Sequence, residues 1–160
     1  MRMGEGVEWG LHCCLTLAWL PGDEPVPTAK LAARFDLPPA YLNKRLQALV
    51  RAGILTSTAG VKGGFRLARR PEKITVMDVV AAIEGPEEAF RCTEIRQQGT
   101  GAEGTPAREF QRPCAVSTVM RKAELAWRRE LAAHTLADVM AAAPATAGER
   151  TRRWYDRVSS

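Results

Sequence analysis

Residues 58–68, Thr-Ala-Gly-Val-Lys-Gly-Gly-Phe-Arg-Leu-Ala, carry the clearest structural pattern in this chain. Short alternating runs, 54–57 and 65–67, flank a glycine-rich reversal, which predicts a β-hairpin with a basic tip. A leucine-patterned basic helix is predicted over 38–52, directly before the hairpin. A basic helix followed by a basic hairpin is typical of a winged helix-turn-helix, in which the helix enters a DNA groove and the hairpin contacts the flanking backbone.

The charge of the chain is concentrated in this same region. The chain has 160 residues and a formal net charge of +5, yet residues 28–73 hold ten Lys or Arg against two acidic residues. The remainder is therefore net acidic, and the basic patch coincides with the predicted helix and hairpin. Such a patch attracts polyanions, so double-stranded DNA is the expected partner. A winged helix that binds only proteins is the alternative from another class.

Three further helices are predicted around the hairpin. Residues 5–20 carry an apolar stripe at helical spacing, and Thr28 is expected to cap a short helix over 29–35. After the hairpin, Thr75 opens a helix that ends before Gly85, with Asp78 in a capping-box position. The predicted fold is mainly α: a winged helix-turn-helix domain plus a long dimerisation helix.

The second half of the chain is predicted to contain a long loop and a long helix. Residues 86–113 show no apolar periodicity, and a loop of that length is usually functional or disordered. The helix over 115–134 has an apolar stripe that its own chain cannot cover, so a second copy of the chain is expected to pack on it as a homodimer. The expected parts are a DNA-binding domain (1–85), a loop (86–114), a dimerisation helix with a short last helix (115–141) and a disordered tail (142–160).

A possible metal site comes from residues outside the basic patch. Glu8 and His12 are one helical turn apart, and Cys92 and Cys114 bracket the long loop. A carboxylate, an imidazole and two thiolates make four ligands for zinc or for an iron–sulfur cluster. From the residues alone, a surface ion pair and a loop thiol explain these positions better, because no Cys-x-x-Cys is present. Cys13 and Cys14 are expected in the core.

At this point the sequence resembles the IscR/NsrR-type winged-helix transcription repressors of bacteria. The matching elements are Tyr41-Leu42 in the predicted recognition helix, 52–55, the hairpin 60–68, the helix 74–85, the cysteine-bearing loop and the 135–138 ending. The resemblance covers roughly residues 1–141. It implies a dimer whose DNA binding is often controlled by an iron–sulfur cluster.

The chain departs from typical members in its cysteines, because the loop has two that are far apart rather than three that are close together. In this respect it is similar to the RsrR-type branch, which holds a [2Fe–2S] cluster through Cys, Glu and His and senses redox change. The resemblance implies that Cys92 and Cys114 of one subunit and Glu8 and His12 of the other hold the cluster. The alternatives are a zinc site, a thiol switch between the two loop cysteines, or a cluster that senses nitric oxide.

The expected function is therefore a redox-controlled transcriptional repressor and not an enzyme, because no nucleophile motif, phosphate loop or paired carboxylates appear. A cytoplasmic location is expected, since no apolar run approaches the length of a membrane span. The residues expected to contact DNA are Thr28, Pro39, Tyr41, Lys44, Arg45, Lys62, Gly63 and Arg66, with Arg69 and Arg70 serving the flanking backbone.

Overall fold

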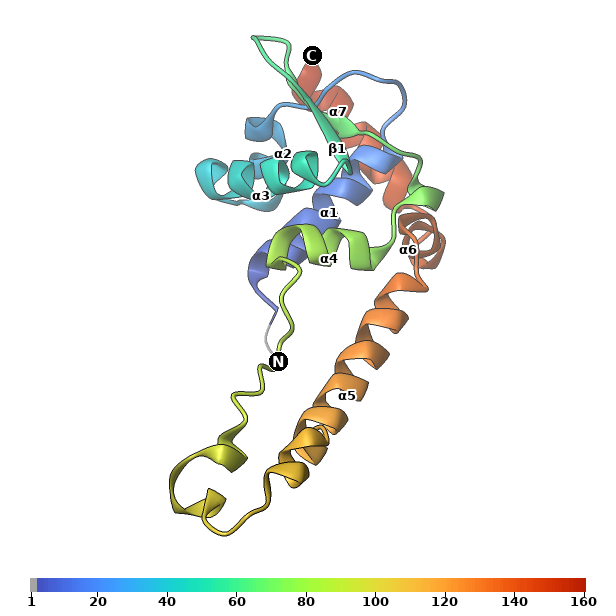
Figure 1. The fold of residues 1–160 in the computed structure, drawn as a ribbon. Helices are drawn as coiled ribbons and strands as arrows, with labels where there is room; N and C mark the ends of the chain where they lie inside the picture. Colours follow the sequence, from blue (N-terminus) through green and yellow to red (C-terminus); the bar gives the residue numbers. More distant parts are fainter. Residues whose placement is uncertain (1–2) are drawn as a thin grey trace. The chain divides into compact units, whose positions relative to one another are not determined.

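The structure is a computed structural model that describes residues 3–160. The chain divides into two compact bodies. We call residues 3–86 together with 131–160 the winged-helix body, and residues 87–130 the loop body. The labelled elements of both are drawn in Figure 1, and each body is described by itself.

The winged-helix body begins with three helices: α1 (Glu5–Trp19), α2 (Thr28–Phe35) and α3 (Pro39–Arg51). The hairpin follows as β1 (Leu55–Thr58) and β2 (Gly64–Leu67), which pair antiparallel with Leu55 opposite Leu67 and Ser57 opposite Phe65. Val26 adds a short bridge to Phe65 through two backbone hydrogen bonds of 2.9 Å. These elements lie within one or two residues of the predicted ones.

The core of this body is built around α1 (Figure 1). Apolar side chains at helical spacing on α3 are fully buried, as the leucine pattern predicts. Helix α1 approaches its neighbours closely at Gly10, where an added Cβ would lie 2.4 Å from Ile83 Cδ1 and 3.7 Å from Leu49 Cδ1. Cys13 and Cys14 are buried here, as expected. The fully buried side chains include Leu31, Leu42, Leu46, Leu49, Ile54, Ile74, Val79 and Leu136.

Helix α4 (Val76–Glu84) and helix α6 (Leu136–Ala142) both begin with a complete capping box. Thr75 accepts a hydrogen bond from the backbone N–H of Asp78, and the Asp78 carboxylate accepts one from the Thr75 N–H. Thr135 and Asp138 repeat this arrangement. The predicted start of α4 is confirmed. The expected cap of α2 is wrong, because the N-cap is Pro27 and the Thr28 hydroxyl instead donates to Asn43 Oδ1 at 3.4 Å.

The tail does not form the disordered segment expected over 142–160. Residues Ala147–Ser159 form helix α7, which packs against α1 in the winged-helix body. Ala147 and Thr151 are buried, with Trp154 and Tyr155 half-buried on the same side. The spacing of these residues is that of one helical face, so burial of this face outweighs the Ala- and Gly-rich composition that suggested disorder.

The loop body is more ordered than the predicted structureless loop. It contains three short 3₁₀ turns, η2 (Ile95–Gln97), η3 (Gly99–Ala102) and η4 (Ala107–Gln111), before α5 (Ala115–Ala132). The first residues of the loop are held to α5, because Arg128 Nη2 donates to the Glu87 carbonyl at 3.2 Å. Arg128 is itself fixed by Glu124 at 2.7 Å. Within residues 3–160, no helix combines the length and apolarity required to cross a bilayer.

Candidate functional site

Helix α3 presents a polar face that packing fixes in place. Leu42, Leu46 and Leu49 anchor its other face in the core, so the residues between them point outward. Tyr41 is 67% exposed and Lys44 is also exposed, and both therefore keep their predicted position on an accessible helix surface. Pro39 stands in the first turn, where its missing N–H costs nothing.

Two predicted DNA contacts are already engaged within the protein. The Arg45 side chain lies along α1, since a Cβ added to Gly6 would come within 2.6 Å of Arg45 Nε. Arg66 Nε donates to Thr56 Oγ1 at 3.1 Å, and its Nη1 donates to the Asp23 carbonyl at 3.3 Å. Arg66 therefore holds the hairpin to the loop between α1 and α2. Any contact of Arg66 with DNA would use its remaining N–H donors.

A groove separates α3 from the hairpin. It is a cavity of about 370 Å³, and its lining combines polar side chains with glycines and a few apolar residues. The hairpin side contains Gly63 and Gly64, where a Cβ would lie 2.1 Å from the Thr58 oxygen and 2.3 Å from the Val26 backbone, respectively. Only glycine fits this close approach. Besides the predicted Thr28 and Gly63, the groove is lined by Asn43, Gln47, Ser57 and Gly60, none of which was predicted to contact DNA.

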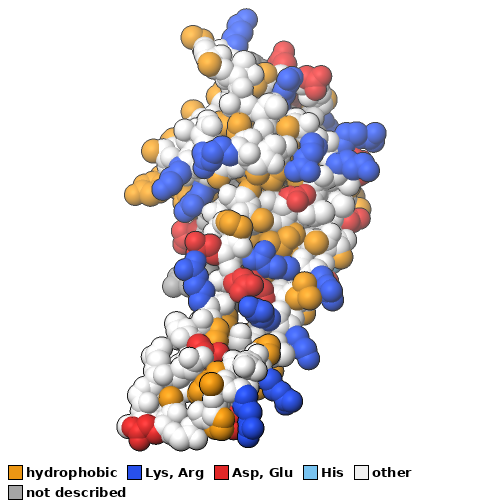
Figure 2. Space-filling view, viewed as in Figure 1, with side chains coloured by type: hydrophobic (Ala, Val, Ile, Leu, Met, Phe, Trp, Pro, Cys, Tyr) orange, Lys and Arg blue, Asp and Glu red, His pale blue; other side chains and the backbone are white. Residues whose placement is uncertain are grey.

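Several basic residues of the 28–73 region have structural roles that charge alone did not indicate. Arg69 donates to the carbonyls of Gly53 and Lys73 and lies 3.9 Å from Asp78, which ties the end of the hairpin to α4. Lys30 instead donates to Ser159 Oγ on α7 at 2.8 Å. Lys62 remains exposed near the hairpin tip, beside the fully exposed Val61. Figure 2 shows Lys and Arg side chains at this tip and over α3.

Glu8 and His12 share one face of α1, as their spacing predicts. Both are exposed and both border a cavity of about 230 Å³, whose other walls are Trp9, Phe35 and Leu37. The His12 ring lies 5.8 Å from the Phe35 ring, between centroids. A carboxylate and an imidazole therefore stand at the rim of one apolar recess. This recess reaches the turn between α2 and α3.

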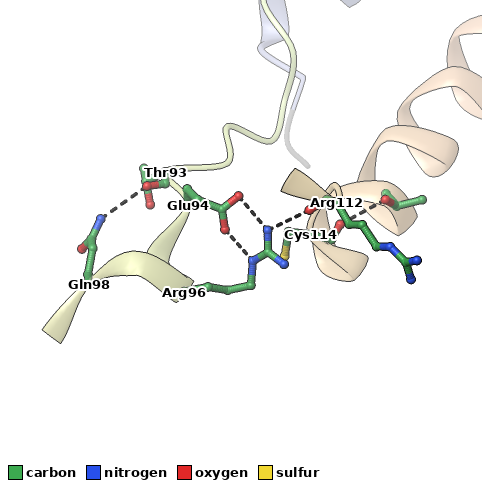
Figure 3. Close-up of polar contacts among 7 residues, drawn as sticks. Thr93, Glu94, Arg96, Gln98, Arg112 and Cys114 are labelled. Atoms are coloured by element: carbon green, nitrogen blue, oxygen red, sulfur yellow. Dashed lines mark hydrogen bonds and ion pairs between the residues drawn. The ribbon is translucent and has the colours of Figure 1, made fainter. Parts of the chain in front are cut away.

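Both loop cysteines interact electrostatically with Arg96, a residue that was not predicted from the sequence. Arg96 is held by Glu94 through two hydrogen bonds of 2.5 and 2.9 Å, and it donates to the Arg112 carbonyl at 3.0 Å (Figure 3). The bond to Glu94 raises the pKa of Arg96 above its usual value, and the charges of Cys114 and Cys92 add to this rise. Cys92 is exposed and Cys114 is half-buried, so both thiols are free to react or to bind a metal.

The other two cysteines have a different environment. Burial raises the pKa of Cys13 to about 12, although the charge of Arg34 opposes part of this rise. Burial also raises the pKa of Cys14, and its neighbour Cys13 adds to the effect. A thiol that stays protonated is a poor ligand and a poor nucleophile. The accessible thiols of this chain are therefore the loop pair.

A single chain does not assemble the four expected ligands. Within residues 3–160, no group of three or more His, Cys, Asp or Glu side chains is placed to hold a metal. Glu8 and His12 belong to the winged-helix body, whereas Cys92 and Cys114 belong to the loop body. Each chain thus provides two separate pairs of donors. A four-ligand site requires that one pair of each kind lies around the same metal centre.

The fold and the polar groove together define a winged helix-turn-helix regulator of the DNA-binding class. Comparison with known proteins identifies the family. Residues 3–142 match the model of the Rrf2 family, described as iron-dependent transcriptional regulators. The chain therefore belongs to the Rrf2 family of transcriptional regulators. This membership confirms the IscR/NsrR-type resemblance and the prediction that the chain is not an enzyme.

Individual relatives agree with this assignment. Protein rrf2 of Nitratidesulfovibrio vulgaris is 32% identical over 140 residues, which are 88% of this chain and 87% of that protein. The regulator NsrR of Geobacillus kaustophilus is 29% identical over 140 residues, 88% of this chain and 90% of its own. The solved structure of T. potens IscR has the same fold, with a TM-score of 0.65 at 23% identity, and covers 92% of this chain and 91% of its own. The predicted fold class is confirmed.

Proposed function

We propose that this chain is a homodimeric transcriptional repressor whose affinity for its operator depends on the redox state of a [2Fe–2S] cluster. The observation that carries the proposal is the pairing of donors. Glu8 and His12 border one recess on α1, and Cys92 and Cys114 flank Arg96 in the loop body. In the proposed dimer, Cys92 and Cys114 of one subunit and Glu8 and His12 of its partner hold the same cluster.

The DNA-binding part of the proposal assigns a role to each side of the polar groove. Tyr41 and Lys44 on α3 would reach base edges or nearby phosphates in the major groove. Lys62 at the hairpin tip would contact the flanking backbone, and Thr28 with Gly63 would line the path of a phosphate strand. Pro39, Arg45 and Arg66 would act mainly by fixing these elements, because Arg45 and Arg66 already have partners within the chain.

The donor chemistry fits a cluster of this kind. Thiolates are the usual ligands of iron–sulfur clusters, and nitrogen ligands can replace two of them on one iron. The two loop thiols are accessible, since Cys92 is exposed and Cys114 is half-buried. When bound, the cluster would supply a one-electron redox change and the accompanying change in charge. Glu8 and His12 would supply the oxygen and nitrogen ligands.

The packing of α1 offers a route from these ligands to DNA. His12 contacts Phe35 at the end of α2, and the recess beside it includes Leu37 in the helix-turn-helix turn. Earlier on α1, Gly6 lies close to Arg45 and Gly10 lies close to Leu49, and both of these partners belong to α3. A small displacement of α1 would therefore tilt α3. A dimer must place two such helices in half-sites about one helical turn apart, so a small tilt would weaken both contacts.

Anaerobic purification of the full chain tests the cluster directly. We expect coloured protein with iron and sulfide in equal amounts and a paramagnetic resonance signal that appears on reduction with dithionite. Glu8→Ala and His12→Ala should change this spectrum, whereas Glu5→Ala, which alters another first-turn acid of α1, should not. Cys92→Ala or Cys114→Ala should prevent cluster retention. Colourless protein with one zinc ion per chain would contradict the proposal.

A thiol switch is the second candidate, because Cys92 and Cys114 both lie near Arg96. This candidate predicts an iron-free chain in which oxidation joins the two thiols and dithiothreitol separates them. Thiol counting before and after oxidation distinguishes the two functions. Two thiols lost on oxidation, with no iron bound at any stage, would favour the switch over the cluster.

A further inference from the structure

A third cavity in the winged-helix body shares only His12 with the cluster ligands proposed above. It has a volume of about 690 Å³ and lies among α1, α2, α6 and α7. One part of its wall is apolar and includes Leu15, Trp19, Val139 and Pro144. The family match ends at residue 142, so the wall supplied by α7 lies outside the matched region.

Arg34 is the unusual residue of this cavity. Its Nη2 donates to Thr151 Oγ1 at 2.9 Å, and its guanidinium lies over the Trp154 ring, 4.4 Å from the centroid. Its Nε is buried and finds no hydrogen-bond acceptor anywhere in the described chain. Buried donors in folded proteins nearly always have an acceptor, so an orphan donor at a cavity wall indicates a missing partner.

The charges around Arg34 also lack compensation. Arg150 and Arg157 of α7 line the same cavity, as does His12 of α1, and no acidic side chain among the described residues lines it. Burial lowers the pKa of Arg34, and the positive charge of Arg150 lowers it further. An anion between these groups would relieve both effects, because it would pair the half-buried charge of Arg34 and reduce the repulsion between Arg34 and Arg150.

We propose that this cavity binds a small organic anion, namely a carboxylate on an aromatic or branched aliphatic body. The carboxylate would accept hydrogen bonds from Arg34 and Arg150, since guanidinium groups match carboxylates in a two-point geometry. The apolar body would lie against the tryptophan and aliphatic walls. The cavity volume lies within the range of small-molecule sites, which combine apolar walls with a few converging polar groups.

The position of this site makes its ligand an effector. Arg34 and Phe35 belong to α2 of the helix-turn-helix, and both line the cavity. His12, which also lines the recess near Glu8, belongs to α1. An anion held between α7 and these helices would therefore stabilise one placement of α2 and α1. This proposal does not rest on the cluster, because the anion would be held by Arg34 and Arg150, which are not among the proposed cluster ligands, although His12 also lines the cavity.

Titration calorimetry on the full-length chain tests the proposal with three carboxylate probes: indole-3-acetate, phenylacetate and 4-methylpentanoate. We expect saturable one-to-one binding of at least one probe, about tenfold or more tighter than its uncharged amide, because one charge-assisted contact corresponds to about that factor. Arg150→Gln should weaken this binding about tenfold. The matched variant Arg152→Gln, which removes the same charge from α7 outside the cavity wall, should leave it unchanged.

Arg34→Gln should weaken binding still more, and Arg157→Gln provides an independent variant if the Arg34 change impairs folding. The proposal is overturned if none of the three probes binds, if each amide binds as tightly as its acid, or if inorganic phosphate binds equally well. It is also overturned if Arg150→Gln and Arg152→Gln have equal effects. The measurement needs neither DNA nor a bound cluster, so it can fail while the proposed repressor function stands.

Discussion

At the scale of single residues, the basic charges of the helix-turn-helix region divide into two groups. Lys44 and Lys62 are exposed, whereas Arg45, Arg66 and Arg69 make contacts inside the protein. Arginine suits such internal roles because its planar group has several donors in fixed directions. The sequence located the charge correctly, but it could not show which cations were already engaged. Their contacts, which include backbone carbonyls, the Thr56 hydroxyl and Gly6, depend on the fold.

Lys62 is expected to contribute a nonspecific phosphate contact. Lys62→Ala should lower the affinity for all duplexes by a similar factor. It should also reduce the slope of log affinity against log salt concentration by about 1, the amount expected for one lost phosphate contact. Val61→Ala, which changes the neighbouring exposed tip residue without removing charge, is the control. Fluorescence anisotropy at several salt concentrations measures both quantities. An unchanged slope in Lys62→Ala would mean that the hairpin does not touch the DNA backbone.

At the scale of secondary-structure elements, local signals were reliable where side chains cap the backbone. The Thr75 and Thr135 boxes follow directly from a threonine placed three residues before an aspartate. Helix α7 was missed because its signal is only one buried face, with Ala147, Thr151 and Trp154 at helical spacing within a polar segment. The order of the loop body was missed because part of it depends on a contact distant in sequence: Arg96 in η2 donates to the Arg112 carbonyl, 16 residues away.

Helix α4 has a side-chain cap at its N-terminus and helix α7 has none, so the two helices allow the contribution of the cap to stability to be measured. Thr75→Ala should reduce the free energy of unfolding by about 1 kcal/mol, because the hydroxyl that caps α4 is lost. Thr146 is the N-cap of α7 but makes no side-chain capping bond. Thr146→Ala should therefore change the free energy of unfolding by less than about 0.5 kcal/mol. Urea denaturation followed by circular dichroism compares the two. Equal losses in both variants would contradict the capping assignment.

The cap of α6 predicts a dependence on pH. Backbone and side-chain hydrogen bonds from Thr135 lower the pKa of Asp138, and the charge of His134 lowers it further. The ionised carboxylate therefore stabilises the fold above its unfolded pKa of about 3.9, and this contribution is lost as the pH falls through the lower folded value.

Asp138→Asn should consequently be less stable than the native chain at pH 6, and the difference should shrink toward pH 3. Urea unfolding of both proteins at these pH values measures it. Asp156→Asn, which makes the same substitution on α7 away from any helix N-terminus, is the control. A difference for Asp138→Asn that does not vary with pH would show that the carboxylate does not act through its charge.

At the scale of the whole molecule, α5 presents large apolar side chains to solvent. Val116 is 61% exposed, Val119 is 64% exposed and Met120 is 40% exposed, all at helical spacing. Exposed apolar stripes of this kind usually mark an interface, and the long stripe had predicted a homodimer from the sequence. The stripe was predictable because it depends only on spacing. The way in which the two subunits pack could not be predicted from the sequence, because it depends on contacts between chains.

Val119→Glu should therefore shift the chain from dimer toward monomer. A charge on a buried apolar seam costs several kcal/mol, and this cost is enough to lower dimer affinity by roughly a hundredfold or more. Arg121→Glu introduces the same side chain on the opposite side of α5 and should leave the dimer intact. Sedimentation equilibrium measures the mass of each variant. A native chain that is monomeric at micromolar concentration would contradict the homodimer.

The central claim is that the redox state of a cluster shared by two subunits sets the affinity for DNA. The most direct measurement uses a duplex selected from a random pool by the cluster-loaded protein under anaerobic conditions. Its Kd is measured before and after one-electron reduction, and again after reoxidation. We expect a reversible change of at least tenfold, equivalent to about 1.4 kcal/mol, that disappears in His12→Ala. The same Kd in both states of a cluster that is demonstrably reduced and reoxidised would contradict the account.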